Sequence, residues 1–397
     1  MENTIYWIWI QQAVGQGSSQ VPRMLEHFPT PKDVYDADRA ALQKAGITGR
    51  ALDKLCDKSL LGAEQILKRS EKLGWIITYD GAGYPELLRH IFSPPLVLYG
   101  RGILPHFDRT TVPSIGMVGT RKCTQYGIRV AGEIAAGLAA VGCVIVSGGA
   151  KGIDRAAHEG ALYVGGRTVV VQACGLDINY PKPNREMRDR VVQEGGAVIS
   201  EYAPGVPGYA NHYDVRNRLI SGLSWGVCVV EAPQRSGALI TARHTRDQNR
   251  DLFVVPGDIT SPASIGSNEL IKEGATLVTR AGEILREYQG CFGGTLSEDE
   301  ANRAQEAYAQ FKADGGVVPM KDEPLMVADN PPPLVISCPE YASDEAKQIF
   351  AALTEMPVDA EELCAATGVA VNRLFAALTE LELMGCIRSY PGKRYSL

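Results

Sequence analysis

Glycine-rich turns with basic and hydroxyl side chains recur in the middle of this sequence, and these residue types bind anions. The first turn is Val118-Gly119-Thr120-Arg121, which follows an apolar run. Gly119 allows the backbone to approach an anion closely, the Thr120 hydroxyl can donate a hydrogen bond, and the Arg121 guanidinium presents a planar fork of donors. We therefore predict that this turn binds a phosphate group.

Two further turns have the same character. The segment Ser147-Gly148-Gly149-Ala150-Lys151-Gly152 leaves an apolar run, and Ser236-Gly237 precedes a helical stretch. Because the turns that leave parallel strands share one edge of the sheet, where ligands bind, we expect them to lie near the first turn. The further candidate anion contacts are Ser147, Gly148, Lys151, Ser236 and Gly237.

A pair of arginines gives the highest density of charge at the same predicted edge. Arg216 and Arg218 are two residues apart, so they cannot share one face of a helix. We predict that one of them reaches a phosphate while the other pairs with an acid, either Glu201 or Glu231.

Recognisable catalytic arrangements are missing from this region of the sequence. His158 has no second histidine or cysteine at a familiar spacing, and we expect it to pack or to cap a helix rather than to act as a general base. The glycine-rich turns lack the Lys-Ser/Thr pair of a nucleotide-binding P-loop, and we find no nucleophile elbow or metal-ligand cluster. We therefore predict a protein that binds a polyanion, with no catalytic residue, metal or cofactor.

Short apolar runs alternate with helical stretches from Ser114 to Val255, and this alternation determines where the turns lie. Runs such as Val144-Ile145-Val146 are apolar throughout, which is typical of strands buried on both faces of a parallel sheet. We predict the α/β fold class, with a Rossmann-like doubly wound, mostly parallel sheet core over residues 71–292.

The flanking regions predict smaller domains. Residues 1–70 carry short helical patterns, including a helix-hairpin turn at Ala45-Gly46-Ile47-Thr48, and predict a small helical domain. Residues 293–343 have the composition of a polar linker, with a helix expected from Glu300 to Ala313. Residues 344–397 contain three helical patterns and a hairpin turn at Pro391-Gly392, which together predict a C-terminal winged helix.

The composition limits the classes of protein to which this chain can belong. The chain has 397 residues, 45% hydrophobic and 22% charged, which excludes an intrinsically disordered protein. Its formal net charge of −6 argues against a protein that is basic throughout, but it is compatible with a local basic groove. The longest apolar stretch, Ala135 to Val146, is too short to span a bilayer, and the nine scattered cysteines indicate reduced thiols. We expect a cytoplasmic protein with no membrane partner.

The motifs also occur in a familiar order. In sequence they are Val118-Gly119-Thr120-Arg121, Ser147 to Asp154, Tyr180-Pro181, Arg216-Asn217-Arg218-Leu219-Ile220-Ser221-Gly222, Glu231, Ser236 to Ala242 and Val255-Pro256-Gly257. In this order they resemble the DNA-processing protein DprA (Smf) family. The resemblance covers essentially the whole chain. It implies an N-terminal domain of sterile-alpha-motif or helix-hairpin-helix type, a Rossmann-like core and a winged helix.

The resemblance also implies a function. Members of this family bind single-stranded DNA in natural transformation, protect incoming strands, dimerise through the core and help to load the RecA recombinase. Transferred to this sequence, Arg121 with Gly119 and Thr120 would contact phosphates, and Arg216 and Arg218 would line the pocket. Where the family usually has Phe-Pro, this chain has Tyr213-Asp214. Tyr213 can still stack on a base, whereas Asp214 adds a negative charge near the expected path of the strand.

Two other functions are compatible with parts of the sequence. A nucleotide hydrolase that cleaves N-glycosidic bonds would need Glu201 or Glu231 as its acid, but the chain lacks the Pro-Gly-Gly-x-Gly-Thr loop typical of such enzymes. A transcription regulator would use the winged helix. Its last helix, Asn372 to Met384, carries only Arg373 as a base, although Lys393 and Arg394 lie in the predicted wing. We favour a non-enzymatic DNA-binding protein with an auxiliary winged helix.

Overall fold

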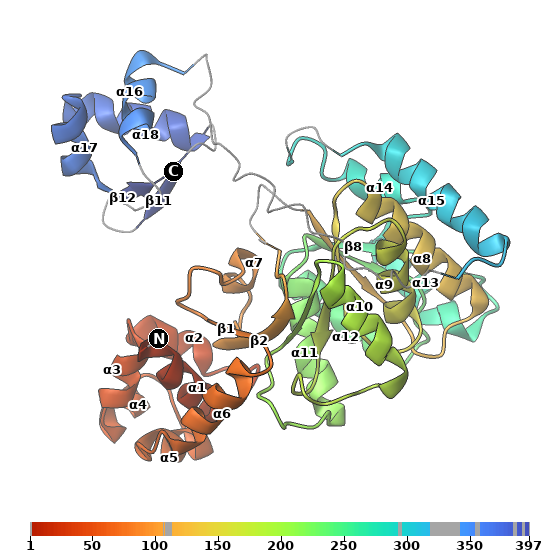
Figure 1. Ribbon diagram of the computed structural model, residues 1–397, viewed down its shortest axis with the longest axis horizontal. Helices are drawn as coiled ribbons and strands as arrows, with labels where there is room; N and C mark the ends of the chain where they lie inside the picture. Colours follow the sequence, from red (N-terminus) through yellow and green to blue (C-terminus); the bar gives the residue numbers. More distant parts are fainter. Residues whose placement is uncertain are drawn as a thin grey trace. The chain divides into compact units, whose positions relative to one another are not determined.

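The computed structural model describes residues 2–105, 107, 113–292, 296–317, 342–353, 358–383, 387–390 and 394–396 (Figure 1). The chain divides into two compact units, Met1–Leu325 and Met326–Leu397. The first unit holds the N-terminal helices and the sheet. The second holds the C-terminal helices and a small sheet of its own.

A nine-stranded sheet forms the centre of the first unit, with the order β1-β2-β6-β5-β4-β3-β7-β8-β9. All neighbours from β6 to β9 are parallel, whereas β2 is antiparallel to β1 and to β6. The mostly parallel sheet predicted from the sequence is therefore confirmed. The strands are β1 (Trp75–Thr78), β2 (Val97–Gly102), β3 (Ser114–Val118), β4 (Val144–Ser147), β5 (Thr168–Gln172), β6 (Ala197–Ser200), β7 (Gly226–Val229), β8 (Asp251–Val254) and β9 (Thr276–Leu277).

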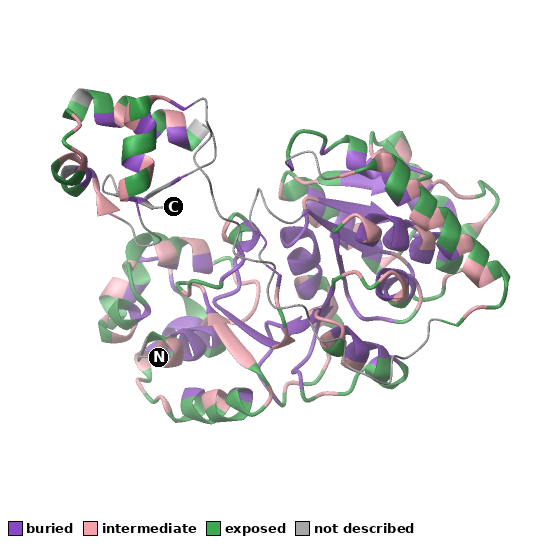
Figure 2. Cartoon of the chain, turned by 45° about the horizontal axis from the view of Figure 1, so that its top comes forward, coloured by how far each residue is buried: buried purple, intermediate pink, exposed green. Residues whose placement is uncertain are grey.

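Helices cover both faces of this sheet. Ile145 packs into the cluster on one face, while Val144 and Val146 pack into the cluster on the other, so the strand needs apolar residues at every position. Figure 2 shows the resulting concentration of buried residues in the strands. The first face is covered by α8 (Gln125–Ala140), α9 (Ile153–Tyr163), α10 (Arg185–Gln193) and α14 (Ala281–Arg286), and the second by α7 (Glu86–Arg89), α11 (Ala210–Gly222), α12 (Gly237–Asp247) and α13 (Ile265–Lys272).

Six short helices precede the sheet, and their core is continuous with its edge. Ile8, Met24 and Leu42 belong to the same buried cluster as Val97 of β2 and Val198 of β6. Asp38 caps the fourth helix, because its carboxylate accepts a hydrogen bond from the Ala41 backbone N–H at 2.8 Å. The helices are α1 (Glu2–Val14), α2 (Val21–His27), α3 (Pro31–Asp36), α4 (Arg39–Lys44), α5 (Gly49–Cys56) and α6 (Leu61–Glu71).

The helix expected within the linker is part of the first unit. Helix α15 (Glu298–Ala313) packs against α8 and α14, and it buries Ala301 and Tyr308. Gly132 of α8 makes room for this packing, since a Cβ there would lie 2.6 Å from the Tyr308 ring. The structure therefore places the first part of the expected linker on the sheet domain. Residues 318–341 lie outside the described part of the chain.

The second unit has the elements of a winged helix. Helices α16 (Asp344–Ala352), α17 (Ala360–Thr367) and α18 (Val371–Leu383) enclose a core that includes Ile349, Leu363 and Leu378. The strands β10 (Val358–Asp359), β11 (Arg388–Tyr390) and β12 (Arg394–Ser396) form an antiparallel sheet in the order β10-β12-β11. The predicted turn at Pro391-Gly392 and the wing residue Lys393 lie outside the described residues, as does the side chain of Arg394.

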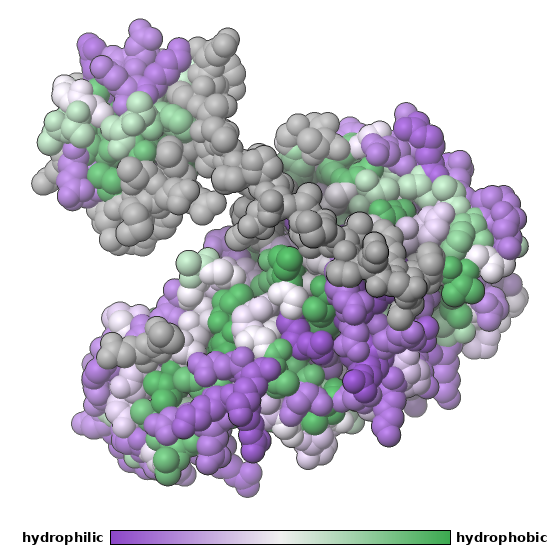
Figure 3. Space-filling view, viewed as in Figure 1, coloured by the Kyte–Doolittle hydropathy of each residue, from purple (hydrophilic) through white to green (hydrophobic). Residues whose placement is uncertain are grey.

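The face drawn in the space-filling view (Figure 3) is mostly hydrophilic among the described residues. On the face shown in Figure 3, hydrophilic residues cover much of the outer helices, and hydrophobic residues gather in smaller patches. Within the described part of the chain, no helix combines the length and apolarity needed to cross a bilayer.

Helices α8 and α9 follow two of the glycine-rich turns, and they approach each other closely at two glycines. A Cβ on Gly160 would overlap the backbone carbonyl of Gly132 and would lie 2.9 Å from the Gly132 Cα atom. Backbone atoms cannot move aside as a flexible side chain can, so any larger residue at position 160 must separate the helices.

The substitution Gly160→Ala is expected to lower the free energy of unfolding by about 1–3 kcal/mol, the usual effect of overpacking. The measurement is urea unfolding of the variant against wild type. Gly62→Ala is a matched control in α6, because its Cβ would meet only the Gln12 side chain at 3.4 Å. It should leave stability unchanged or raise it by up to about 1 kcal/mol. Equal effects of the two substitutions would contradict the close approach.

Candidate nucleic-acid interface

A cavity of about 510 Å³ lies where the order of the strands reverses. From β3 the chain moves outward through β4, β5 and β6, and then returns to β7 on the other side of β3. The connections after β3 and β7 therefore run in opposite directions and leave a crevice at the carboxyl ends of these strands. The cavity is lined by the turn Gly119 to Lys122, by residues of α11, and by Ser236 and Gly237 at the start of α12.

A smaller cavity of about 190 Å³ adjoins the first. The two share the lining residues Arg121, Ala150, Tyr180 and Tyr213. The smaller one extends toward the end of β5 and is also lined by Gly148, Lys151, Gln172, Ala173, Cys174 and Pro181.

An arginine and an aromatic ring stack where the two cavities meet. The guanidinium carbon of Arg121 lies 4.4 Å from the centroid of the Tyr213 ring, which is a cation–π contact. Arg121 is exposed to solvent, and Tyr213 is partly buried. Burial, followed by the neighbouring Tyr180, raises the pKa of Tyr213 to about 12, so its phenol is neutral at physiological pH. This corner of the site therefore offers both a fixed cation and an uncharged aromatic ring.

The first two turns interlock through their glycines. A Cβ on Gly119 would lie 2.8 Å from the Ile153 Cβ atom at the start of α9. Gly152 has φ +85°, and a Cβ there would lie 2.6 Å from the Thr120 carbonyl oxygen. Gly152 is also the N-cap residue of α9, which has no side-chain capping hydrogen bond. The close contact holds the two glycine-rich turns beside each other.

Glu231 supports the first turn from behind and does not line either cavity. Its carboxylate accepts hydrogen bonds from the Thr124 backbone N–H at 2.9 Å and from the Thr124 hydroxyl at 2.5 Å, at the N-terminus of α8. A carboxylate is favoured there by the helix dipole. The backbone carbonyl of Glu231 also accepts the Thr120 N–H at 2.8 Å. Glu231 is thus a structural anchor of the turn.

The two arginines of α11 point to different partners, as their spacing predicts. Arg216 is buried and lines the larger cavity, and its Nη1 donates to the carbonyl oxygens of Gly148, at 2.7 Å, and Val171. Asp154 is also buried on the cavity wall. Its burial raises the pKa of the carboxyl group, against the opposing effect of the Arg216 guanidinium. Arg216 therefore both fixes the second turn and contributes positive charge to the cavity.

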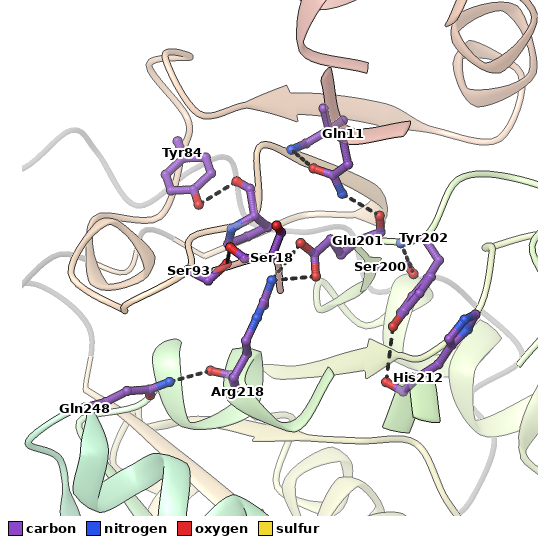
Figure 4. A network of polar contacts seen from close by, with 12 residues as sticks. Gln11, Ser18, Tyr84, Ser93, Ser200, Glu201, Tyr202, His212, Arg218 and Gln248 are labelled. Carbon is purple, nitrogen blue, oxygen red and sulfur yellow. Dashed lines mark hydrogen bonds and ion pairs between the residues drawn. The ribbon is translucent and has the colours of Figure 1, made fainter. Parts of the chain in front are cut away.

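Arg218 faces away from both cavities, contrary to its expected role in the pocket. Its Nη2 donates to both carboxylate oxygens of Glu201, at 2.7 and 2.8 Å, and both side chains are buried (Figure 4). The Glu201 carbonyl oxygen accepts the Gln11 side-chain N–H at 2.9 Å. Arg218 thus belongs to the junction between the N-terminal helices and the sheet. The acid that pairs with an arginine is Glu201, one of the two expected partners.

Nine of the eleven expected contact residues line one or both cavities: Gly119, Thr120, Arg121, Gly148, Lys151, Tyr213, Arg216, Ser236 and Gly237. Arg218 and Ser147 do not. Ser147 is buried, and its hydroxyl donates to the Met117 carbonyl oxygen at 2.5 Å, because the last residue of β4 faces inward.

Sequence reasoning missed several residues of the lining. Lys122 and Arg235 are exposed and line the larger cavity, and each is adjacent in sequence to an expected contact. With them, the described lining holds five cationic side chains and two carboxylates, namely Arg121, Lys122, Lys151, Arg216 and Arg235 with Asp154 and Asp214. Among the described residues, no group of three or more His, Cys, Asp or Glu side chains is placed to hold a metal ion.

His158 is enclosed beneath the second turn and does not line either cavity. Its Nδ1 lies 2.7 Å from the Thr168 hydroxyl, which itself donates to the Ile145 carbonyl oxygen at 2.7 Å. Nδ1 must therefore carry the proton, which leaves Nε2 buried with no partner among the described residues. Burial, followed by the Arg216 charge, lowers the pKa of His158 to about 3. This is the packing role expected from the sequence.

The low pKa of His158 predicts a dependence of stability on pH. Between pH 6.5 and 3 the unfolded chain binds a proton at His158 and the folded chain does not, so folding stability falls as the pH falls. From pH 7.5 to 5.5, wild type should lose about 1.4 kcal/mol more than His158→Gln, which cannot titrate. Urea unfolding at the two pH values measures this difference. An identical loss in both proteins would contradict the neutral, buried imidazole.

Comparison with known proteins finds two matching sequence families and several similar proteins. Residues 75–289 match the sequence family described as DNA recombination-mediator protein A, and residues 330–393 match the DprA winged helix domain. The protein Smf of Synechocystis sp. is 33% identical over 396 residues, which cover 98% of each chain. The DNA processing protein DprA of Streptococcus pneumoniae is 42% identical over 206 residues, 52% of this chain and 71% of that protein.

A solved structure shows the same architecture. The X-ray structure of DNA processing protein A from Streptococcus pneumoniae superposes with a TM-score of 0.62 and 33% sequence identity. The match covers 72% of this chain and 98% of that chain.

Proposed function

This chain belongs to the DNA recombination-mediator protein A family, known as DprA or Smf, and from this premise we propose that its cavity binds single-stranded DNA. The observation that carries the proposal is the stack of Arg121 on Tyr213 between the two cavities. A single strand exposes both phosphates and unpaired bases, and the stack presents a donor for the first and an aromatic ring for the second. A duplex keeps its bases paired and would use only the cations.

In this proposal, each of the other cavity residues contacts either the phosphates or the bases of the strand. Phosphates are bound by Arg121, Lys151 and Arg216, and by the backbone N–H groups of the glycine-rich turns and of the first turn of α12. Tyr213 stacks on a base. Because Asp214 reduces the positive charge of the lining, we expect affinity to depend strongly on the remaining cations.

The cellular role that we propose follows from family membership. The protein acts in natural transformation, where it protects incoming single strands and helps to load the RecA recombinase. It works in the cytoplasm as a homodimer that associates through the sheet domain, and it performs no catalytic step. The apolar residues Leu270 and Ile271 of α13 are a candidate dimer contact, although Leu270 is largely buried within the protein.

Neither alternative function gains support from the site. The carboxylates that a nucleotide hydrolase would use are engaged elsewhere, since Glu201 pairs with Arg218 and Glu231 accepts hydrogen bonds from Thr124, the N-cap residue of α8. In the winged helix, Arg373 pairs with Glu345 at 3.1 Å, and Glu380 accepts hydrogen bonds from Ser343. These contacts favour a packing role for the polar residues of α18 and an auxiliary role for the domain.

The substitution Arg121→Ala should weaken binding of an oligo-dT strand by about 10- to 150-fold, because a hydrogen bond to a charged group contributes about 1.5–3 kcal/mol. It should also reduce the slope of log affinity against log salt by about 0.7, the share of one phosphate contact on a single strand. Fluorescence anisotropy of the labelled strand at several salt concentrations measures both quantities, with a duplex of the same length for comparison.

The matched control is Arg280→Ala. Arg280 is exposed, lies outside both cavities and pairs with Glu306, so its removal should change neither affinity nor salt slope. If Arg121→Ala bound oligo-dT as wild type does, the assigned role of Arg121 would be wrong. If wild type showed no preference for the single strand over the duplex, the proposed function would be wrong.

Removal of residues 344–397 tests where the main site lies. The described cavity lining belongs entirely to the first unit, so the shortened chain should keep its affinity for oligo-dT within about threefold. A complete loss of binding by a chain that still unfolds cooperatively would place the main site in the winged helix instead.

A further inference from the structure

An aromatic cluster borders the larger cavity at the start of α11, and none of its members lines the cavity itself. Tyr209 is the N-cap residue of α11, and the residues on either side of it, Gly208 and Ala210, are part of the cavity lining. The Tyr209 side chain is 57% exposed. A large aromatic ring is thus held in solvent directly at the cavity rim.

The Tyr209 ring is supported from beneath. It packs edge-on against the His212 ring, with centroids 5.1 Å apart and planes at 85°. His212 is in turn stacked on Tyr202, with centroids 4.1 Å apart and planes at 17°. Tyr202 is buried, and its hydroxyl donates to the His212 carbonyl oxygen at 3.4 Å, as Figure 4 shows for this pair. The exposed ring therefore rests on two others that are anchored in the sheet domain.

The loop that leads to Tyr209 is also fixed. The Gly175 N–H donates to the Val206 carbonyl oxygen, and the Gly205 N–H donates to the Asp177 carboxylate, both at 2.8 Å. A Cβ on Gly205 would lie 3.4 Å from Nη1 of Arg69, an exposed cation of α6. Rigid support reduces the conformational entropy that a ring loses when a ligand stacks on it.

Tyr209 precedes Tyr213 by four residues, the spacing of neighbours on one side of a helix. Gly208, the residue before Tyr209, lets the Tyr213 hydroxyl approach the backbone closely, because a Cβ there would lie 3.0 Å from that hydroxyl. An unpaired base that leaves the cavity past Tyr213 would meet the Tyr209 ring next.

We propose that Tyr209, supported by His212 and Tyr202, is a second base-stacking platform that holds a nucleobase of the same strand outside the cavity. This inference rests on the proposed function, since it extends the path of the single strand. The ligand is a nucleobase of any type, because every base has a stacking face. The platform lengthens the binding site toward the N-terminal helices, where Arg69 is available to the strand's phosphates.

The test compares oligo-dT with a strand of the same length and backbone that lacks bases. Tyr209→Ala should weaken binding of oligo-dT by about 5- to 150-fold, the equivalent of one lost stacking contact, and should leave binding of the abasic strand unchanged. Tyr209→Phe should restore the affinity for oligo-dT. Phe92→Ala is the matched control, because Phe92 is 73% exposed and lies outside both cavities.

A second variant reports the stacking directly. With Tyr209→Trp, addition of oligo-dT should quench the added tryptophan fluorescence, measured as the difference from wild type, and the abasic strand should not. Wild-type affinity of Tyr209→Ala for oligo-dT, or an equal loss for both strands, would overturn this inference alone. Failure of wild type to bind oligo-dT at all would overturn the proposed function and this inference with it.

Discussion

The contact between Gly119 and Ile153 determines how far apart the first two turns can lie, and the cavity depends on that distance. A side chain at position 119 would force the turn after β3 away from the start of α9. The same two segments meet again at Gly152 and the Thr120 carbonyl. The close packing of α8 on α9 at Gly132 and Gly160 continues this approach along the helices. This part of the cavity surface is thus built from backbone segments packed at short range, an arrangement in which N–H groups can bind a phosphate.

Buried arginines in this fold hold segments together, and the exposed cations of the site line the cavity. Arg216 binds the second turn and also lines the cavity, and Arg218 joins helix α11 to Glu201, which follows β6. The cost of burying each guanidinium is offset in part by its acceptors, which are backbone carbonyls for Arg216 and a carboxylate for Arg218. Arg121, Lys122 and Arg235 remain exposed on the lining. Helix α11 therefore carries both Arg218, a member of the buried ion pair, and Tyr213, which lines the two cavities, so a shift of this helix moves both.

Much of this arrangement could be predicted from the sequence. Apolar runs predicted the parallel strands, because burial on both faces leaves no polar positions in them. The spacing of Arg216 and Arg218 predicted that their side chains point to different sides of the helix. It could not predict which arginine faces the cavity, because that depends on what packs on each side of α11. Ser147 was assigned to the site for its position beside glycines, whereas the pleat of β4 turns its hydroxyl inward. The packing of α15 on α8 depends on Gly132, whose role is visible only once Tyr308 lies over it.

The Arg121–Tyr213 stack would also influence how long a strand, the ligand that we propose, stays bound. Before binding, the ring already has a cation 4.4 Å away, so a base that stacks on the same face replaces an existing contact. That contact is worth about 0.5–1 kcal/mol at an exposed site, which reduces the net gain from stacking. Affinity differences among related complexes arise mostly in the dissociation rate. For the single strand that we propose as the ligand, this exchange of one stacking partner for another would favour a short residence time at Tyr213.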